Sequence, residues 1–329
     1  MSSPSRGIAL LSYPNYEVFP VLIQILSHLE PVANYALFGT GRRSSTPHGT
    51  PFHQAFDHLL EYIWKGNQDP LQQQQQLMER LVQTLKEAYP LPDNPDIMEL
   101  FVTMVSLLMD ANHELATVFC TERATVLTMC PACTFTNNPR TDMTSKHKVS
   151  TQQWKEFEST GILDTALIED VDGYHCQVCG TTYTARKSDL ISKPPEILVL
   201  ELDRYFFNYE TFTLQKSNTL FSLDVKTPLP FRYYTQEGSA IQLYDLVAVA
   251  NHEGLGTSGV YSCCFWNTAL HKWFCCHGNQ LPTPFTHNLE SFITPSNYVL
   301  FFTKKKPIQQ KPSFLRQFGT MDISFSFSE

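Results

Sequence analysis

Apolar side chains recur at helical spacing through the first third of the chain. After Pro20, residues three or four apart define one helix face, and Pro31 is expected to close this helix; the face comprises Val21, Leu22, Ile25, Leu26 and Leu29. The same spacing predicts three more helices, at residues 52–64, 71–89 and 96–112. The glutamine run in the second of these is interpreted as a solvated helix face. The first third is therefore predicted to be a helical subdomain.

Strand patterns replace the helical spacing after Val118. Residues 193–205 predict a strand entered through two prolines, and residues 219–231 predict a strand and a turn. Residues 244–277 are predicted to form strands around a loop that contains glycine, because apolar side chains recur at alternate positions on both sides of the loop. A closing strand is expected at residues 296–302. The chain is thus predicted to be helical first and β-rich afterwards.

Two C-x-x-C pairs indicate a metal site. They are Cys130 with Cys133, and Cys176 with Cys179. Two such hairpins can each offer two thiolates to one tetrahedral Zn²⁺, so a structural zinc ion is the expected cofactor. The 42 residues between the pairs exceed a compact zinc ribbon, which predicts an irregular, inserted middle segment. The alternative is that these are four ordinary buried cysteines.

Composition narrows the class of protein. The chain has 329 residues, a net charge of −8 and no basic stripe, so direct nucleic-acid binding is not expected. We expect neither a signal peptide nor a membrane span, since no apolar run approaches the roughly 20 residues that a transmembrane helix needs. Nine cysteines without a regular disulfide framework indicate unpaired thiols and an intracellular location, in the cytoplasm or the nucleus.

Residues 244–277 carry the pattern Y-x-L-x-x-V-x-x-H-x-G, then S-G-x-Y, then a tryptophan. This pattern resembles the C-terminal box of the ubiquitin-specific cysteine proteases. In that family the residue between the glycine and the tyrosine is the histidine that activates the nucleophile, and here it is Val260. The family's orienting Asp or Asn lies four residues beyond the tryptophan, which places His277 at that position after Trp273.

The N-terminal segment resembles the family's nucleophile box, N-L-G-N-T-C-Y-M-N followed by V-L-Q. Anchoring the box on Asn15 and Gln24 places Glu17 where the family has its catalytic cysteine. The same register places Ser12 at the asparagine that helps form the oxyanion hole. Pro14 and Tyr16 take the positions of the glycine and the threonine, which predicts a closed or reshaped substrate cleft.

Three further boxes resemble the family in the correct order. They are the D-A-x-E-F helix (Asp96 and Glu99), the P-x-x-L-x-x-x-L-x-R-F strand at residues 193–205, and the closing S-A-Y-x-L-F-Y strand. The resemblance implies an α+β, papain-like ubiquitin-specific protease fold with a helical thumb, zinc-bearing β fingers and an antiparallel β palm. The implied boundaries within one domain of residues 1–303 are 7–115 for the thumb, 116–190 for the fingers and 191–303 for the palm, followed by a poorly ordered tail at 304–329.

With Glu17, Val260 and His277 at the triad positions, the resemblance implies a pseudoenzyme without hydrolase activity. The expected function is a protein-interaction scaffold or adaptor, and a second expectation is binding of ubiquitin or a ubiquitin-like modifier without cleavage. The alternative is an active deubiquitinase with a relocated Cys–His dyad. The candidate nucleophiles are two pairs of adjacent cysteines, Cys263, Cys264, Cys275 and Cys276. The candidate bases are the nearby histidines His252, His271 and His277. The N-terminal box also resembles the protease-like domain of the poly(A)-specific deadenylase catalytic subunit.

Overall fold

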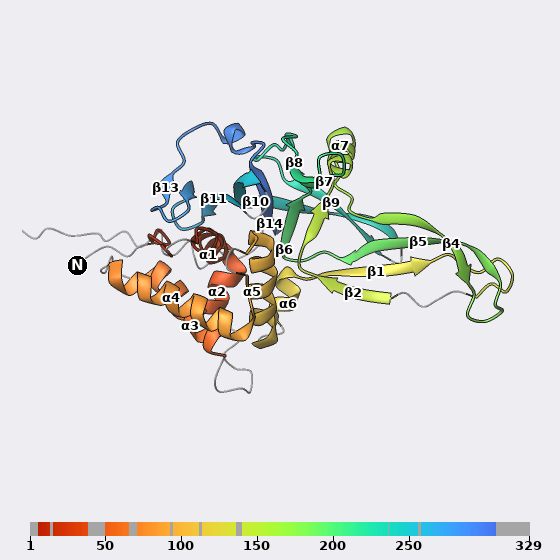
Figure 1. Cartoon of the computed structure of the whole chain (residues 1–329), viewed down its shortest axis with the longest axis horizontal. Coiled ribbons are helices and arrows are strands. Elements are labelled where there is room, and N and C mark those ends of the chain that lie inside the picture. Colours follow the sequence, from red (N-terminus) through yellow and green to blue (C-terminus); the bar gives the residue numbers. More distant parts are fainter. Residues whose placement is uncertain are drawn as a thin grey trace, which may run out of the picture.

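The computed structural model describes residues 6–13, 16–38, 50–65, 71–92, 95–111, 114–135, 140–235, 237–255 and 258–306. Figure 1 shows a layer of helices packed beneath a central β-sheet, from which a long arm of strands projects to one side. Most of the predicted tail at residues 304–329 falls outside the described residues.

In the described part of the chain, six helices precede the first strand. Their bounds are α1 Val18–His28, α2 Glu30–Phe38, α3 Pro51–Lys65, α4 Leu71–Ala88, α5 Ile97–Ala111 and α6 Glu114–Phe119. The predictions at residues 52–64, 71–89 and 96–112 are therefore confirmed to within one or two residues, as far as the described residues reach. The first predicted helix ends at His28, just before Pro31, and Leu29 is extended. Pro31 itself lies in the first turn of α2, a position that does not require a backbone N–H donor.

The central sheet has the strand order β13-β12-β11-β10-β14-β6-β3, and β9 pairs with β10. Its pairs are antiparallel except for the parallel pair β3–β6. The strands are β3 His147–Val149, β6 Ile197–Leu202, β9 Leu229–Thr235, β10 Gly238–Leu255, β11 Ser258–Asn267, β12 Lys272–His277, β13 Thr283–Pro284 and β14 Asn297–Lys304. A 3₁₀ helix, Leu289–Phe292, precedes β14.

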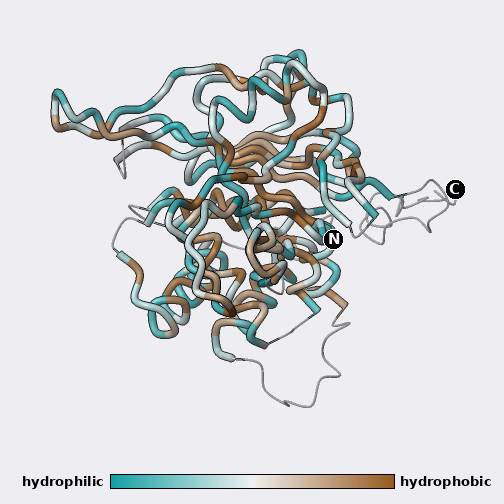
Figure 2. The backbone as a smooth tube through the Cα atoms, turned by 90° about the vertical axis from the view of Figure 1, so that its right-hand side faces the viewer, coloured by the Kyte–Doolittle hydropathy of each residue, from teal (hydrophilic) through white to brown (hydrophobic). Residues whose placement is uncertain are grey.

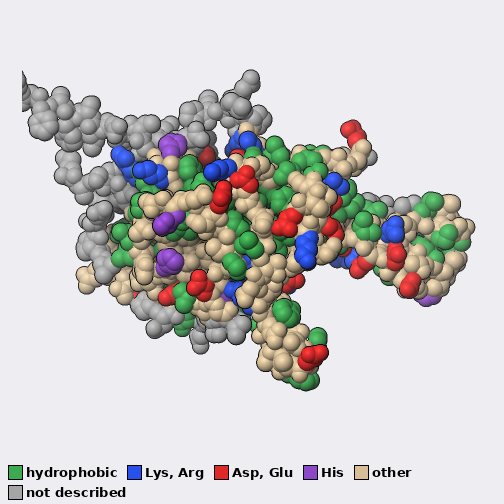
Figure 3. Space-filling view, turned by 90° about the horizontal axis from the view of Figure 1, so that it is seen from above, with side chains coloured by type: hydrophobic (Ala, Val, Ile, Leu, Met, Phe, Trp, Pro, Cys, Tyr) green, Lys and Arg blue, Asp and Glu red, His purple; other side chains and the backbone are tan. Residues whose placement is uncertain are grey.

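The projecting arm is a second sheet, with the strand order β2-β1-β5-β4. Its strands are β1 Thr121–Leu127, β2 Arg140–Thr144, β4 Leu167–His175 and β5 Thr182–Lys193. Figure 3 shows this arm extending from the body when the molecule is seen from above. A separate two-stranded hairpin consists of β7 Tyr205–Asn208 and β8 Thr213–Lys216.

Over its described residues, 134–135 and 140–175, the segment between the two C-x-x-C pairs is not irregular, contrary to the prediction. Besides β2, β3 and β4 it contains the helix α7, Thr151–Thr160. A reciprocal capping box formed by Ser150 and Gln153 starts this helix, and Gly161 ends it at a φ of 72°. Trp154 is buried in the palm core, and its indole N–H donates to the carbonyl of Ser222 at 3.0 Å. The inserted segment is therefore ordered: β2 and β4 belong to the arm, and β3 and α7 pack on the palm.

Two hydrophobic cores lie on the two faces of the central sheet. One fills the space between helices α1–α6 and the inner face of β10, β11 and β14, and the other lies under α7 on the outer face. Figure 2 shows hydrophobic backbone positions gathered in the middle of the molecule. The sheet is thus covered on both sides.

Every residue of α1 is buried. Among the described residues, no single helix is long and apolar enough to cross a membrane; α1 and α2 pass such a test only as a pair, bent by 84°. The three-part division at residues 7–115, 116–190 and 191–303 stays a prediction. β14 runs to Lys304, one residue past the predicted palm, and residues 307–329 of the predicted tail lie outside the described residues.

His28, in the last turn of α1, is a buried histidine held in its neutral form. Its Nδ1 donates to the carbonyl oxygen of Gln24 at 2.7 Å, and Nδ2 of Asn267 donates to its Nε2 at 3.4 Å. The ring stacks 4.0 Å from Phe265. Burial lowers the pKa of His28 from 6.5 to about 4. The fold therefore disfavours protonation of this ring.

We predict that acid destabilises the protein through His28. The unfolded chain binds a proton below pH 6.5 and the folded chain only near pH 4, so stability present at neutral pH is lost as the pH falls between these values. In urea denaturation, this one group should lower the free energy of unfolding by about 2 kcal/mol between pH 7 and pH 5. His28→Gln should remove that part of the pH dependence, and the matched change His58→Gln on the exposed side of α3 should keep it. An unchanged pH dependence in His28→Gln would contradict the assignment.

Candidate functional site

Glu17 stands at the N-terminal end of α1, at the position that the family box gives to the nucleophile. It is half-buried, and its carbonyl oxygen accepts the N–H of Val21 at 3.3 Å, in the first helical turn. Its side chain lies directly against Gly278, which has a φ of +49°. A Cβ added to Gly278 would come within 2.6 Å of Cδ and 3.0 Å of Oε1 of Glu17. The carboxylate therefore fills the space beside the loop that follows His277.

Val260 and His277 lie on one face of the β11–β12 ladder. Ser262 is the register partner of His277, and Val260 is two residues before Ser262, so all three side chains project from the same side. Val260 is 51% exposed and His277 is also exposed. Glu17 thus lies beside the loop that follows His277, whereas Val260 and His277 project from the face of the ladder that carries Cys264 and Cys275, opposite the face covered by α1. Within the described part of the chain, Glu17 and His277 form no ion pair, although the sequence allowed one.

The loop that carries Ser12 is tied to the same turn. The N–H of Tyr13 donates to Oδ1 of Asn279 at 2.8 Å, and Ser12 beside it is half-buried. Tyr13, Tyr16 and Phe19 form an aromatic cluster with ring centroids 5.5 to 6.3 Å apart. Pro14 and Asn15, on which the prediction of a reshaped cleft depends, lie outside the described residues.

A polar cleft of about 390 Å³ opens beside His277. Its walls include Ser262 and Asn251 from neighbouring strands and His287 from the segment after β13. Nδ2 of Asn251 donates to Oγ of Ser262 at 3.3 Å. The cleft therefore offers hydroxyl, amide and imidazole groups on the face of the ladder that carries Val260 and His277.

The four cysteines of β11 and β12 occupy two environments. Cys264 and Cys275, directly opposite one another with Cα atoms 4.1 Å apart, are joined by a disulfide on the outer face. Cys263 and Cys276 face the inner core and are 0% and 1% exposed. Burial raises the pKa of the Cys263 thiol, whereas the hydrogen bond from that thiol lowers the pKa of Cys276. The expectation of unpaired cysteines is wrong at Cys264 and Cys275, because strand register brings them into contact.

A buried polar network that the sequence analysis missed connects α5 to the palm. Asp96 accepts hydrogen bonds from the hydroxyls of Tyr261 (3.1 Å) and Tyr298 (3.3 Å) and from the N–H of Met98 at the start of α5. His252 is fully buried beside this network and hydrogen-bonds to the hydroxyl of Tyr205. Burial lowers the pKa of His252, which favours its neutral form. Its burial and hydrogen bond indicate a structural role for this histidine.

The four cysteines of the C-x-x-C pairs gather at the far end of the arm, as predicted. All four sulfurs lie within 4.8 Å of one another. The sulfurs of Cys130 and Cys179 are 3.7 Å apart, and those of Cys133 and Cys176 are 3.6 Å apart. Four sulfurs at about 2.3 Å from one tetrahedral ion would lie about 3.8 Å apart, so the arrangement fits a Cys₄ metal centre.

Two similar knuckles present these sulfurs. In the first, the N–H of Thr134 donates to the carbonyl of Cys130 at 3.0 Å; in the second, Gly180 donates to Cys176 at 2.9 Å. The donor residue has a positive φ in both cases, 59° at Thr134 and 71° at Gly180. This shared geometry turns each chain back so that both cysteines of a pair point to one centre.

The protonation states of these thiols differ. The hydrogen bond between the Cys179 sulfur and the Thr181 hydroxyl lowers the pKa of Cys179 to about 6, and the backbone N–H of Cys179 lowers the pKa of Cys176. At Cys133 the N–H of Phe135 acts in the same direction, but desolvation and the neighbouring sulfurs outweigh it and raise the pKa to about 12. A metal ion would therefore have to displace protons, which makes its binding pH-dependent.

Known structures share this fold. The Ubp8/Sgf11/Sus1/Sgf73 deubiquitinase module of SAGA bound to ubiquitin aldehyde matches 93% of this chain and 72% of the neighbour's chain, with a TM-score of 0.71 and 17% identity. Another structure of the Ubp8-Sgf11-Sgf73-Sus1 module covers 93% and 70%, with a TM-score of 0.67 and 14% identity. The chain thus has the α+β fold of ubiquitin-specific proteases, and that prediction is confirmed.

Sequence comparison identifies the family. The model described as ubiquitin carboxyl-terminal hydrolase matches residues 19–302, so the chain belongs to the ubiquitin carboxyl-terminal hydrolase family. Ubiquitin carboxyl-terminal hydrolase 4 of Mus musculus is 25% identical over 151 residues, which are 46% of this chain and 15% of the relative. Ubiquitin carboxyl-terminal hydrolase 3 of Homo sapiens is 28% identical over 146 residues, 43% of this chain and 26% of the relative. The chain therefore matches only a minor part of each relative's length.

Proposed function

We propose that this chain is a catalytically inactive member of its family that acts as a protein-interaction scaffold or adaptor. The observation that carries the proposal is Glu17 at the start of α1, in the register where the family has its nucleophilic cysteine. A thiol protease needs a thiolate and an adjacent base to form and break an acyl–enzyme bond. Glu17 offers no thiolate, and the alkyl side chain of Val260 accepts no proton. His277 then has no catalytic imidazole to orient.

The contacts around Glu17 support this proposal. Its side chain packs against Gly278, and the neighbouring loop is held by the hydrogen bond from Tyr13 to Asn279. In an active site of this class, the equivalent space must admit an extended substrate and leave the nucleophile open to attack. Here protein atoms occupy the space beside the nucleophile position. Ser12 could donate a hydrogen bond to an oxyanion, but no nucleophile is present to create one.

A relocated nucleophile is the alternative, and the environments of the nearby cysteines argue against it. Cys263 and Cys276 are buried in the inner core, where a ubiquitin terminus has no access. Cys264 and Cys275 are joined by a disulfide and carry no free thiol. A reactive cysteine needs exposure and a stabilised thiolate together. None of these four described cysteines combines the two.

The interaction role is supported by aromatic side chains exposed on the β7–β8 hairpin. Phe206 and Phe207 are 50% and 45% exposed, and Tyr209 and Phe212 are both 78% exposed. Three of them form a cluster, with the Phe207 ring centroid 5.1 Å from that of Tyr209 and 6.4 Å from that of Phe212. Exposed apolar groups that gather in this way mark protein-binding surfaces.

Reading of ubiquitin without cleavage is the second candidate function. Exposed apolar residues near the end of the arm favour it, among them Met129 (53%) and Val178 (64%). A structural neighbour with the same fold is bound to ubiquitin aldehyde. If the chain is a ubiquitin reader, replacing Val178 and Phe212 by serine should abolish ubiquitin binding in calorimetry. If the chain is a scaffold without a ubiquitin role, neither the wild type nor this variant should bind ubiquitin.

We further propose that the Cys₄ cluster holds a structural zinc ion. Sulfur spacing near 3.8 Å and the paired knuckles fit tetrahedral zinc, for which thiolates are preferred ligands. The ion would join β1 and its following turn to the β4–β5 turn at the far end of the arm. It would have no role in hydrolysis.

We predict no hydrolysis of a fluorogenic ubiquitin C-terminal amide by the wild-type chain. The rate should equal that of buffer and should not change in Glu17→Ala, because no thiolate or base is present. The matched variant carrying Glu17→Cys, Val260→His and His277→Asp restores the three side-chain types. If these three positions alone account for the loss of hydrolase activity, the rate of the triple variant should exceed the wild-type rate by roughly 10³-fold or more. Hydrolysis by wild type that disappears on chelation or cysteine alkylation would overturn the proposal.

We predict that the purified chain contains one equivalent of zinc by elemental analysis. Cys176→Ser combined with Cys179→Ser should lose the metal, since two remaining thiolates make an incomplete tetrahedral site. The arm should then become sensitive to proteolysis while the helical circular dichroism signal persists. Cys120→Ser changes a cysteine outside the cluster and should retain the zinc. Metal content that is unaffected by the double substitution would contradict the assignment of these ligands.

A further inference from the structure

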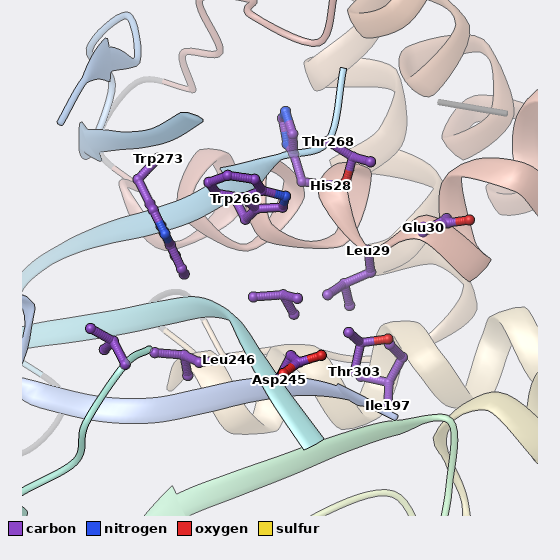
Figure 4. Close-up of a pocket in the computed structure, with 12 residues that line it drawn as sticks. His28, Leu29, Glu30, Ile197, Asp245, Leu246, Trp266, Thr268, Trp273 and Thr303 are labelled. Atoms are coloured by element: carbon purple, nitrogen blue, oxygen red, sulfur yellow. The ribbon is translucent and has the colours of Figure 1, made fainter. Parts of the chain in front are cut away.

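A cavity of about 280 Å³ lies at the opposite end of α1 from Glu17. His28, Leu29 and Glu30, at the junction of α1 and α2, form one part of its lining (Figure 4). α1 has 11 residues, and its length of about 16 Å separates this cavity from the nucleophile position. The cavity is therefore distinct from the site that defines the family.

Two tryptophans form the wall on one side. Trp266 and Trp273 are register partners on the outer face of the β11–β12 ladder, with ring centroids 6.0 Å apart and planes inclined at 63°. Phe292 packs against Trp273 at 4.8 Å and supports its ring. The other two tryptophans of the chain, Trp64 and Trp154, are completely buried, whereas Trp266 is only half-buried. A large indole surface is thus left open to the cavity.

Carboxylates lie among the other lining residues. Figure 4 shows Asp245 across the cavity from the two indoles, and Glu30 at its side. Both are half-buried, and neither carboxylate has a hydrogen-bond or ion-pair partner within the ranges that the structure describes. Lys304, near this edge of the sheet, is paired with Glu196 at 3.8 Å. The formal charges that line the cavity are therefore negative.

The remaining polar groups do not offset this charge. His28 is held neutral by burial, which lowers its pKa to about 4. Thr303, the register partner of Asp245, and Thr268 contribute hydroxyl groups only. An anionic ligand would meet two unpaired carboxylates without any compensating cation.

An irregularity in β10 shapes the floor of the cavity. The register between β10 and β14 shifts between Leu246 and Ala248, and the three consecutive residues Asp245, Leu246 and Val247 all line the cavity. In a regular strand, successive side chains point to opposite faces. Bulges of this kind re-aim side chains and are frequent beside binding sites. The local backbone thus brings a carboxylate and apolar surface to the same space.

We propose that this cavity binds the cationic side chain of an arginine or lysine presented by a partner protein. The indole faces attract a cation through their quadrupoles, and Asp245 and Glu30 supply negative charge around it. The aliphatic stem of such a side chain would pack against Leu29 and Leu246. A neutral apolar group would fill the same space but would leave both carboxylates desolvated without a partner. The proposal does not depend on the loss of hydrolase activity.

The test uses Nα-acetyl-L-arginine amide as the probe and the neutral isostere Nα-acetyl-L-citrulline amide as its control. Tryptophan fluorescence and calorimetry on the full chain should give saturable arginine binding in the millimolar range, roughly tenfold weaker for citrulline. Raising the salt concentration should weaken arginine binding, because the attraction is electrostatic. Equal binding of the two probes, or no saturable binding of the arginine probe, would overturn the proposal.

Substitutions test the contributions of the carboxylate and of the indole surface to arginine binding separately. Asp245→Asn should weaken arginine binding roughly fivefold to tenfold and leave citrulline binding unchanged. Trp266→Leu should weaken arginine binding more than Trp266→Phe does, because phenylalanine keeps an aromatic face. Glu210→Gln, at an exposed carboxylate of the β7–β8 turn, is the matched control and should bind like wild type. Thermal melting of each variant checks folding, and undiminished arginine binding in folded Asp245→Asn would contradict the role of this carboxylate.

Discussion

The burial of α1 between the other helices and the inner face of the central sheet is the constraint on which the structure depends. An entirely buried helix is stable only if its polar side chains are satisfied. Gln24 donates to the carbonyl of Ala9 at 2.7 Å, and His28 bonds to Gln24 and Asn267. The indole of Trp64 donates to the carbonyl of Ser27 at 2.9 Å. These contacts fix the middle and the C-terminal end of the helix, and the rigid helix connects the nucleophile position at one end to the cavity at the other.

This constraint explains how the fold can persist with altered chemistry. The packing of α1 depends on its apolar side chains and on Gln24 and His28, and none of these is a triad position. Glu17 sits just outside the buried stretch, where the positive end of the helix dipole favours a negative charge, as it would favour a thiolate. A carboxylate at this place therefore costs the fold little. The proposed loss of catalysis and the retention of the family fold are then physically compatible.

Much of this architecture can be predicted from sequence, because helix spacing and the order of the family boxes are local signals. The Cys₄ cluster can also be predicted from sequence, since each C-x-x-C pair forms a compact turn. Helix α7 was missed although Ser150 and Gln153 carry a capping signal, because the segment around Trp154 is short and polar. The Cys264–Cys275 disulfide and the cavity depend on strand register and on a bulge, which bring distant residues together. Only the three-dimensional arrangement reveals those features.

Intact mass spectrometry after incubation with ubiquitin bearing a thiol-reactive group at its C-terminus tests the central claim most directly. The proposed inactive chain should keep its own mass, with its melting transition and zinc content confirming that it is folded. Glu17→Cys provides the positive control, because it places a thiol at the nucleophile position. A ubiquitin-sized adduct on the wild-type chain, mapped to one cysteine, would contradict the account and identify a relocated nucleophile.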